Sequence, residues 1–554
     1  MTEAIFIVLV VVGVLAACMV ISYIDNMRRM YKIRKRLAYN YGRWREVDYS
    51  DAVLSVIGEY TESNESMIDD ITWNDLDMDA LFMSINHTWS FAGEDYLYYL
   101  LHVPKVTPEE WEEQEELIEF YQTHEKERIE MQMEFARIGK NHATSVYSYI
   151  MDCIRINTKV PPVHYFSFLF FLFSVFITVM SPSGGIGLLI MAMVVNVALY
   201  FYKRKELEGY MQALQYFKKL MTGAKALTKK KLICSRKYHL RVEEDYRHLK
   251  KLMGASAYLG PANWDSPSLA EMFLDYIRLV THIDCIFFYH CMRRLGQNIE
   301  VVENMFTTMG FLESMLAVGS LREALPEWCR PEFTEEKMLS ITDAYHPSLS
   351  DPVPNSVSVK DGILITGSNA SGKSTFLKTT AMNVILAQSL HTCAAAQYRG
   401  KWFHVFSSMA LKDSLYKGES YYIAEIRALK RVMEPVEEDA VICFVDEVLR
   451  GTNTVERIAA STQVLKEFQK KGILCFAATH DIELTYLLED KYDNYHFQEQ
   501  VIDGEIVFDY LIYDGRATSR NAIQLLEILG YEPGIIEGAK NMVEQFLETG
   551  KWVS

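Results

Sequence analysis

The 554-residue sequence predicts membrane-spanning helices, then an all-helical core, then a C-terminal α/β domain. Three observations lead to this fold class. Uncharged runs near the N-terminus and around residue 180 are long enough to cross a bilayer. Apolar residues recur at helical spacing between about residues 207 and 280. From about Ile341 short apolar strands alternate with helices, which indicates a largely parallel sheet.

Composition excludes several classes of protein. Hydrophobic residues make up 49% and charged residues 23% of the chain, so a folded protein is expected. A net charge of −17 argues against a protein that coats nucleic acid over its whole surface, although it allows a local basic site. The nine cysteines form no C-x-x-C pair and accompany no clustered histidines, so we predict neither a zinc site nor a disulfide framework.

The first predicted element is a transmembrane anchor at residues 1–26. Residues 4–23 carry no charge, and twenty residues are the length of a spanning helix. Eight basic and no acidic residues follow at 27–45, so the N-terminus is expected outside and the basic juxtamembrane linker, residues 27–77, in the cytoplasm. A signal peptide is the alternative, but its basic flank should precede the apolar run.

A second apolar block at residues 163–202 is interrupted by the turn signal SPSGG at 181–185. Each half is about long enough to span, and basic residues flank the block at Lys159 and at 203–205. We therefore expect a transmembrane hairpin at residues 163–202, inserted among helices of the core. The alternative is a buried hairpin of a soluble domain. Three spans predict a multi-pass cell-membrane protein whose later residues are cytoplasmic.

Long packed helices are predicted around the hairpin. Thr107 supplies a capping hydroxyl and Pro108 suits the first turn of a helix. Apolar stripes at 207–217 and 269–280 are typical of helix faces packed in a core. The basic stretch at 229–237 is either a solvated helix face or a contact for phosphate groups.

The α/β domain, residues 346–554, is expected to bind ATP through a loop between a strand and a helix. The spacing G-x-x-x-x-G-K-S follows the apolar run at 362–365. Backbone N–H groups of such a loop, with the positive end of the next helix, surround a phosphate. Lys373 would reach the β- and γ-phosphates, and Ser374 would hold Mg²⁺. The candidate loop residues are Gly367, Ser368, Asn369, Ala370, Ser371, Gly372, Lys373, Ser374 and Thr375.

Two more predicted strands end in reactive side chains. The run VICFVDE ends in Asp446 and Glu447, and GILCFAATH ends in His480. Because parallel strands share their carboxyl edge, these groups are expected beside the phosphate loop. Asp446 would hold Mg²⁺ through water, and Glu447 would orient or deprotonate the attacking water. His480 would sense the γ-phosphate. The predicted catalytic residues are Glu447, His480 and Lys373.

These motifs resemble the ATPase domain of the MutS family, within the ABC-type ATPases. TGSNASGKST, with Asn369, resembles the family's phosphate loop, and GESYYIAEI at 418–426 its signature segment. DEVLRGTNT and ATHDIEL resemble its metal-and-base motif and switch-histidine segment, and residues 513–542 resemble its closing helix-turn-helix. The resemblance implies a homodimer in which Ser420 of one subunit contacts the γ-phosphate bound by the other.

The resemblance extends upstream to about Met78, and it implies a helical core and lever domain at residues 78–345 with the hairpin inserted in it. SINHTWSFAGEDYLYYLLHVP at 84–104 is similar to the opening of the family's helical core, and DAYHPSL and VPNSVSV resemble the stretch that leads into its ATPase domain. The chain before residue 78 is too short for the family's mismatch-reading domain and contains no Phe-x-Glu motif. The family's DNA clamp is expected to be reduced or missing.

The resemblance implies an ATP-driven motor that moves helical levers on mismatched or branched DNA. One alternative keeps the motor but couples it to the membrane, to a protein or to a lipid partner. Another is the ATPase half of a transporter, which the number of spans (three) and the position of the hairpin inside a MutS-like core disfavour.

Overall fold

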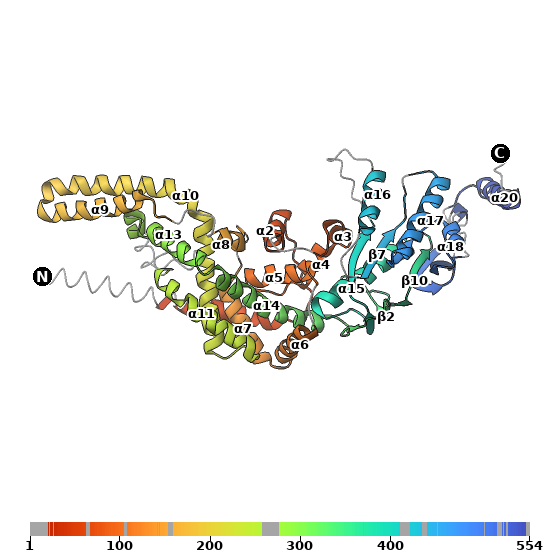
Figure 1. The fold of residues 1–554 in the computed structure, drawn as a ribbon, viewed down its shortest axis with the longest axis horizontal. Coiled ribbons are helices and arrows are strands. Elements are labelled where there is room, and N and C mark those ends of the chain that lie inside the picture. The colour runs from red at the N-terminus through yellow and green to blue at the C-terminus, as the bar shows by residue number, and fades with distance from the viewer. Residues whose placement is uncertain are drawn as a thin grey trace. The chain divides into compact units, whose positions relative to one another are not determined.

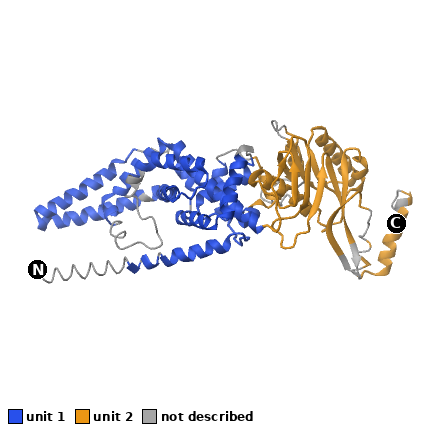
Figure 2. Ribbon diagram, turned by 90° about the horizontal axis from the view of Figure 1, so that it is seen from below, with its two compact units in different colours: residues 1–66, 80–324 blue, residues 67–79, 325–554 orange. Residues whose placement is uncertain are grey.

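The computed structural model describes residues 20–549 with gaps and divides into two compact units (Figure 2). Unit 1 comprises residues 1–66 and 80–324, and unit 2 comprises residues 67–79 and 325–554. The chain therefore passes from unit 1 into unit 2 twice. The gaps in the description are residues 22, 26, 63–66, 105–107, 141, 143, 153–158, 257–275, 369, 410–420, 435–439, 451, 503–504, 518–522, 524–525 and 528–529.

The described part of unit 1 is helical and is organised around one buried helix, α14 (Ile299–Ala324) (Figure 1). Gly310 lets α14 approach α5 (Phe91–His102), because a Cβ at Gly310 would lie 2.5 Å from the carbonyl oxygen of Ala92. The predicted helix start is confirmed, since α6 (Pro108–Thr123) begins at the proline. Outside the hairpin, unit 1 also contains α2 (Asp51–Glu62), most of α4 (Met78–Ile85), α7 (Glu125–Ile138), α8 (Val146–Met151), α11 (Arg236–Ser256) and α13 (Ile283–Gly296), and residues 27–40 are helical as well.

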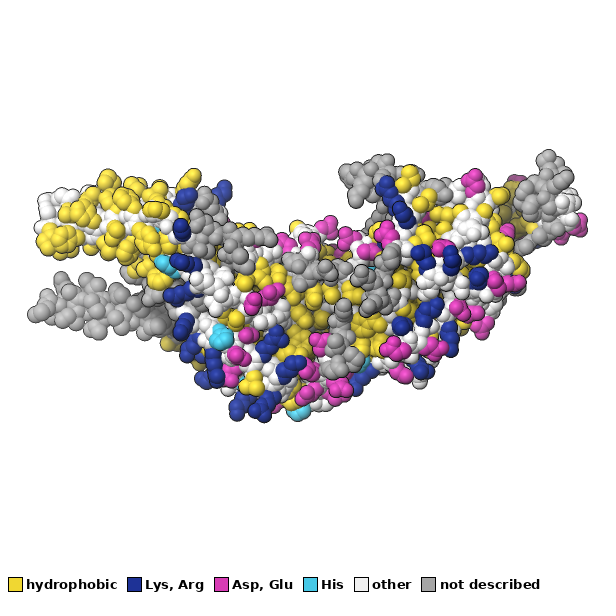
Figure 3. All heavy atoms as spheres, viewed as in Figure 1, with side chains coloured by type: hydrophobic (Ala, Val, Ile, Leu, Met, Phe, Trp, Pro, Cys, Tyr) yellow, Lys and Arg dark blue, Asp and Glu magenta, His cyan; other side chains and the backbone are white. Residues whose placement is uncertain are grey.

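An apolar hairpin is formed by α9 (Pro162–Met180) and the first half of α10 (Pro182–Lys229). Both helices are long and apolar enough to cross a membrane, and only 17% and 22% of their apolar windows are buried. Figure 3 shows apolar side chains gathered over this hairpin. The turn is shorter than the predicted 181–185, because Ser181 alone separates the helices and Pro182 takes the first helical turn. The predicted N-terminal span lies mostly outside the described residues.

A single helix joins the hairpin to the core of unit 1. The sequence predicts a separate helix near Leu207, but α10 is continuous for 48 residues, about 70 Å. Its second half buries Leu214, Phe217 and Leu220, whereas its first half exposes Ile186 and Ile190. The helix predicted at 269–280 lies mostly outside the described residues.

Unit 2 contains a six-stranded sheet in the order β10-β9-β4-β8-β7-β6. All neighbours are parallel except β9 and β10, so the predicted largely parallel sheet is confirmed. The strands are β4 (Gly362–Thr366), β6 (Phe403–Ser408), β7 (Ala440–Asp446), β8 (Leu474–Ala478), β9 (Tyr492–Ile502) and β10 (Glu505–Asp514). The accompanying helices are α15 (Lys373–Leu390), α16 (Tyr421–Val432), α17 (Thr454–Lys470), α18 (Ile482–Leu487) and α20 (Pro533–Thr549).

A second sheet moves the domain boundary toward the N-terminus. Its order is β1-β5-β2-β3, and its strands are β1 (Glu332–Phe333), β2 (Leu339–Ala344), β3 (Asn355–Val359) and β5 (Gln397–Gly400). Because β1 and β2 pair with later strands, unit 2 resumes at Leu325 and not at the expected residue 346. The expected linker at 27–77 is likewise divided, since it contains α2 in unit 1 and α3 (Asp70–Asp75) in unit 2.

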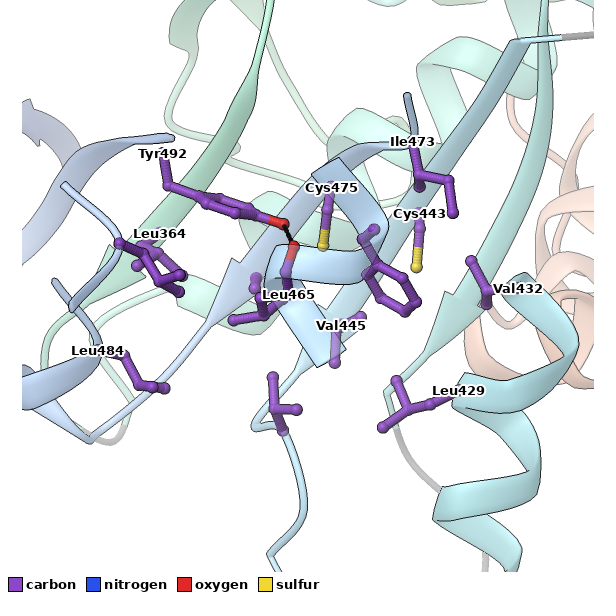
Figure 4. Close-up of a cluster of buried hydrophobic side chains, with 14 of the residues drawn as sticks. Leu364, Leu429, Val432, Cys443, Val445, Leu465, Ile473, Cys475, Leu484 and Tyr492 are labelled. Atoms are coloured by element: carbon purple, nitrogen blue, oxygen red, sulfur yellow. Dashed lines mark hydrogen bonds between the residues drawn. The ribbon is translucent and has the colours of Figure 1, made fainter. Parts of the chain in front are cut away.

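An apolar cluster between the six-stranded sheet and α17 fixes the strand ends (Figure 4). Leu465 from α17 packs with Cys443, Val445 and Cys475 of β7 and β8, all 0–1% exposed. Tyr492 at the start of β9 donates a 2.8 Å hydrogen bond to the carbonyl oxygen of Leu465, so its buried hydroxyl is satisfied. This packing fixes β7 and β8, and therefore the positions of the residues that follow them.

Candidate functional site

The strand ends predicted to meet do meet. β8 lies between β4 and β7, and Ala478 pairs with both Ile365 and Asp446. The amide of Thr479 donates to Ile365 O at 2.9 Å, and the amide of Glu447 donates to Ala478 O at 3.0 Å. The loops after β4, β7 and β8 consequently open at one edge of the sheet, as expected for ligand-binding loops of parallel sheets.

The loop after β4 has the tight backbone that a phosphate cradle requires. Gly367 and Gly372 have φ values of 145° and 112°, and Ala370 has 66°. A Cβ at Gly367 would lie 2.8 Å from the carbonyl oxygen of Phe497, so only glycine fits there. The Ser371 hydroxyl donates to Ser368 O at 2.8 Å and closes the turn. Asn369 lies outside the described residues, and Thr375 follows on the first turn of α15.

Lys373 is the first residue of α15 and is 5% exposed. Its Nζ donates to the carbonyl oxygens of Gly367 and Ser368 at 2.8 and 2.7 Å. Burial lowers the pKa of this ammonium, although the carboxylates of Asp446 and Glu447 oppose that effect. The side chain is therefore held at the loop, where it can exchange its carbonyl partners for phosphate oxygens.

Ser374 and Asp446 come together as a pair of oxygen ligands. The Ser374 hydroxyl donates to Asp446 Oδ2 at 2.5 Å, although the residues are 72 positions apart. A hydroxyl and a carboxylate are hard oxygen donors of the kind that Mg²⁺ prefers beside phosphates. The residues thus fit the predicted Mg²⁺ site.

Glu447 is held between two basic side chains. His480 Nε2 lies 2.9 Å from Glu447 Oε1, and Arg450 Nε lies 2.6 Å from Oε2. Glu447 has φ of 62°, which is uncommon for a residue with a Cβ and typical of functional sites. These two contacts fix both oxygens of the carboxylate. The predicted neighbours Glu447 and His480 are in direct contact, while Arg450 was not predicted.

A cavity of about 170 Å³ lies beside the phosphate loop and was also not predicted. It is lined by Gly372 and Phe376 from one side and by Tyr510 from β10. A bulge between Phe508 and Ile512 gives Tyr510 a φ of 57°. Asn355 fixes this bulge, because its amide donates to Tyr510 O at 3.0 Å and its Oδ1 accepts from the Ile512 amide at 2.8 Å.

Glu499 is a further unpredicted neighbour of the loop. Its Oε2 accepts a 2.7 Å hydrogen bond from the Ser368 hydroxyl. Ser420, predicted to act across a dimer, lies outside the described residues. Of the closing segment at 513–542, the structure describes the end of β10 and most of α20, with gaps between them.

Comparison with known proteins identifies the region that holds this site. Residues 363–547 match the family MutS domain V. A DNA mismatch repair protein MutS from Streptococcus uberis is 29% identical over 231 residues, or 39% of this chain and 27% of that protein. The corresponding protein from Bacillus licheniformis is 26% identical over 325 residues, or 56% of this chain and 37% of that protein.

Human MutS protein homolog 4 is 25% identical over 300 residues, or 51% of this chain and 32% of that protein. The chain thus spans about a quarter to two-fifths of the length of these relatives. The region that is similar to MutS domain V therefore contains the loop at 367–375 and the side chains of Asp446, Glu447 and His480.

Proposed function

We propose that this protein is a membrane-anchored, dimeric ATPase of the MutS type that uses ATP hydrolysis to move its helical unit. The observation that carries the proposal is the meeting of five side chains at one sheet edge. Lys373 lies on the phosphate loop, Ser374 bonds to Asp446, and Glu447 contacts His480. This is the set of parts that positions a phosphoryl group, a metal ion and a water molecule.

In the proposed reaction the loop amides and Lys373 bind the β- and γ-phosphates of ATP. Ser374 and Asp446 would hold Mg²⁺, which neutralises charge on the phosphate oxygens when bound. Glu447 orients the attacking water and accepts its proton. His480 fixes the Glu447 carboxylate through Nε2, and Arg450 holds the other oxygen.

The cavity beside Tyr510 is the proposed site of the adenine base. Its lining is mostly apolar, and Tyr510 lies near Gly372 at the start of α15. An aromatic ring beside a phosphate loop offers a face on which a purine can stack. The base, the phosphates and the metal ligands would then follow one another along the edge of the sheet.

We further propose that two chains share each ATP site, with Ser420 of one chain completing the site of the other. Mixing Lys373→Ala with Ser420→Arg chains is expected to restore phosphate release, because each mixed dimer contains one site with both native elements. Neither variant alone should hydrolyse ATP. The measurement is steady-state phosphate release after co-expression. A dead mixture of folded chains that do form dimers would argue for sites built within one chain.

The proposed location is the cell membrane, with three spans, the N-terminus outside and the ATPase unit in the cytoplasm. The length and exposure of α9 and the first half of α10 support this location. A cysteine introduced at Ser183 in the hairpin is expected to react with an impermeant maleimide applied to intact cells, because the hairpin tip would face outward. A cysteine at Ser554 should react only after lysis, and the unsubstituted protein is the control. Labelling of Ser554 in intact cells would contradict the proposed orientation.

The relatives' names support DNA as the substrate of the motor, since two of them are called DNA mismatch repair proteins. Binding is expected to be insensitive to mismatches and steeply dependent on salt, because it would rest on contacts between basic side chains and phosphates. It is expected to be weak because the basic stretch at 229–241 is partly neutralised. Lys230 lies 2.7 Å from Glu134, and Lys237 lies 2.7 Å from Glu113. The measurement is a salt titration of the full chain in detergent with labelled homoduplex and mismatched duplex. Tight, mismatch-selective binding would contradict this expectation.

A second candidate function couples the same motor to the membrane. Arg28, Lys32 and Arg36 are exposed and follow one another at helical spacing, so they form one basic face. Such a face beside a span binds anionic lipid headgroups. The two functions are separated by phosphate release from the full chain, measured with duplex DNA and with anionic vesicles. Stimulation by DNA favours the first, and stimulation by vesicles alone favours the second.

A further inference from the structure

Residues 67–79 are distant in sequence from the rest of unit 2 but are hydrogen-bonded to it. Asp69 caps α3 by accepting from the Thr72 amide at 2.8 Å. The same carboxylate accepts two hydrogen bonds from Arg431 on α16, at 2.9 and 3.1 Å. A two-point contact between guanidinium and carboxylate fixes direction as well as distance. One side chain thus joins the capped end of α3 to the last turn of α16.

The same segment also holds the end of β6. The Ser407 amide donates to the Thr72 hydroxyl at 3.0 Å, and the Ser407 hydroxyl donates to Asp75 Oδ2 at 2.7 Å. Asp75 Oδ2 also accepts from the Met409 amide at 2.8 Å. Thr72, Asp75 and Ser407 are at most 4% exposed, so these bonds are shielded from water.

The first half of α16 contacts the loop that follows β7 and carries Glu447, Leu449 and Arg450. Glu425 is 4% exposed, and its carboxylate accepts from the amides of Leu449 and Arg450. Leu449 has φ of 62°, a conformation that persists only where surrounding contacts impose it. Arg450 in turn holds the Glu447 carboxylate at 2.6 Å. Glu425 is therefore placed to maintain the strained loop that aims Glu447.

We propose that α16 is a rigid link through which the segment at 67–79 positions Glu447 for hydrolysis. The link runs from Asp69 to Arg431, along about 9 Å of helix to Glu425, and through the backbone of Leu449 and Arg450 to Glu447. This inference rests on the proposed ATPase function. It makes Asp69, Arg431 and Glu425 positioning residues.

The link gives hydrolysis a connection to the helical unit. The chain enters the segment from residue 66 and leaves it at residue 80, both in unit 1. A movement of unit 1 that shifts this segment therefore changes the position of α16, and it also reaches α15, where Lys378 donates to Asp77 at 2.5 Å. The Asp69–Arg431 contact acts on α16, so its loss is expected to change turnover without changing ATP binding.

The test is Asp69→Asn in the full chain. Asparagine still caps a helix, so α3 is retained, but the charge that pairs with Arg431 is lost. We expect kcat to fall by about 2- to 30-fold, the range of couplings measured along such networks, with KM and nucleotide affinity unchanged. Amide exchange at Leu449 and Arg450 should rise. The matched control is Glu336→Gln, which removes an exposed ion pair with Lys360 and should change neither quantity.

Arg431→Lys is a second test of the link, because lysine keeps the positive charge but cannot make the two-point contact with Asp69. It should also lower kcat, and the Asp69→Asn/Arg431→Lys pair should fall no further than the more affected single variant. Unchanged kcat and exchange in either folded variant, or a change in KM alone, would overturn the proposal. If the unsubstituted protein releases no phosphate, the ATPase function fails, while exchange at Leu449 and Arg450 still decides whether the link exists.

Discussion

Glu447→Gln is expected to leave ATP binding intact and to lower turnover by about 10²- to 10⁴-fold. The amide has nearly the shape of the carboxylate, so the neighbouring His480 and Arg450 keep a partner of similar size. It cannot accept the proton of the attacking water. Asp446 and Ser374 remain in place to hold Mg²⁺.

The measurement pairs phosphate release with the affinity for a fluorescent ATP analogue. Asp446→Asn is the informative comparison, because it should raise the Mg²⁺ concentration needed for activity, whereas Glu447→Gln should not. Glu467→Gln on α17, which loses only an exposed pairing with Lys470, is the control. Normal turnover by Glu447→Gln would remove this residue from the mechanism.

Lys373→Ala is expected to weaken nucleotide binding by about 10- to 150-fold, the loss of one charge-assisted hydrogen-bonding group. The ammonium is nearly buried at the loop and lies where the phosphates are expected. Its removal also frees two loop carbonyls, so a thermal melt must show that the variant is folded.

The matched control for this variant is Lys360→Ala, which removes an exposed lysine of the same unit. Titration with the fluorescent analogue measures both variants against the unsubstituted chain. If Lys373→Ala binds the analogue as tightly as the unsubstituted chain, Lys373 does not contribute to phosphate binding at this loop.

The edge of the sheet that carries Asp446, Glu447 and His480 could be predicted because each residue ends an apolar strand. Strand register then leaves little freedom in where these side chains lie. The position of Tyr510 could not be predicted, since it depends on a bulge and a positive φ that tyrosine rarely adopts.

The contacts of Asp69 and Asp75 could not be predicted either, because their partners lie 362 and 332 residues away in the sequence. Local patterns of charge or periodicity do not indicate pairs at such a separation. The turn at 181–185 was predicted too long for a different reason. Proline and glycine often end a helix, but Pro182 here begins one.

The most direct measurement is phosphate release by the purified full chain in detergent, with ATP, in the presence and absence of Mg²⁺, beside Glu447→Gln. Hydrolysis is expected to require Mg²⁺ and to be lost in the variant, while both proteins bind the nucleotide. Nucleotide binding without Mg²⁺-dependent release above the level of Glu447→Gln would contradict the assignment of this sheet edge as an ATP-hydrolysing site.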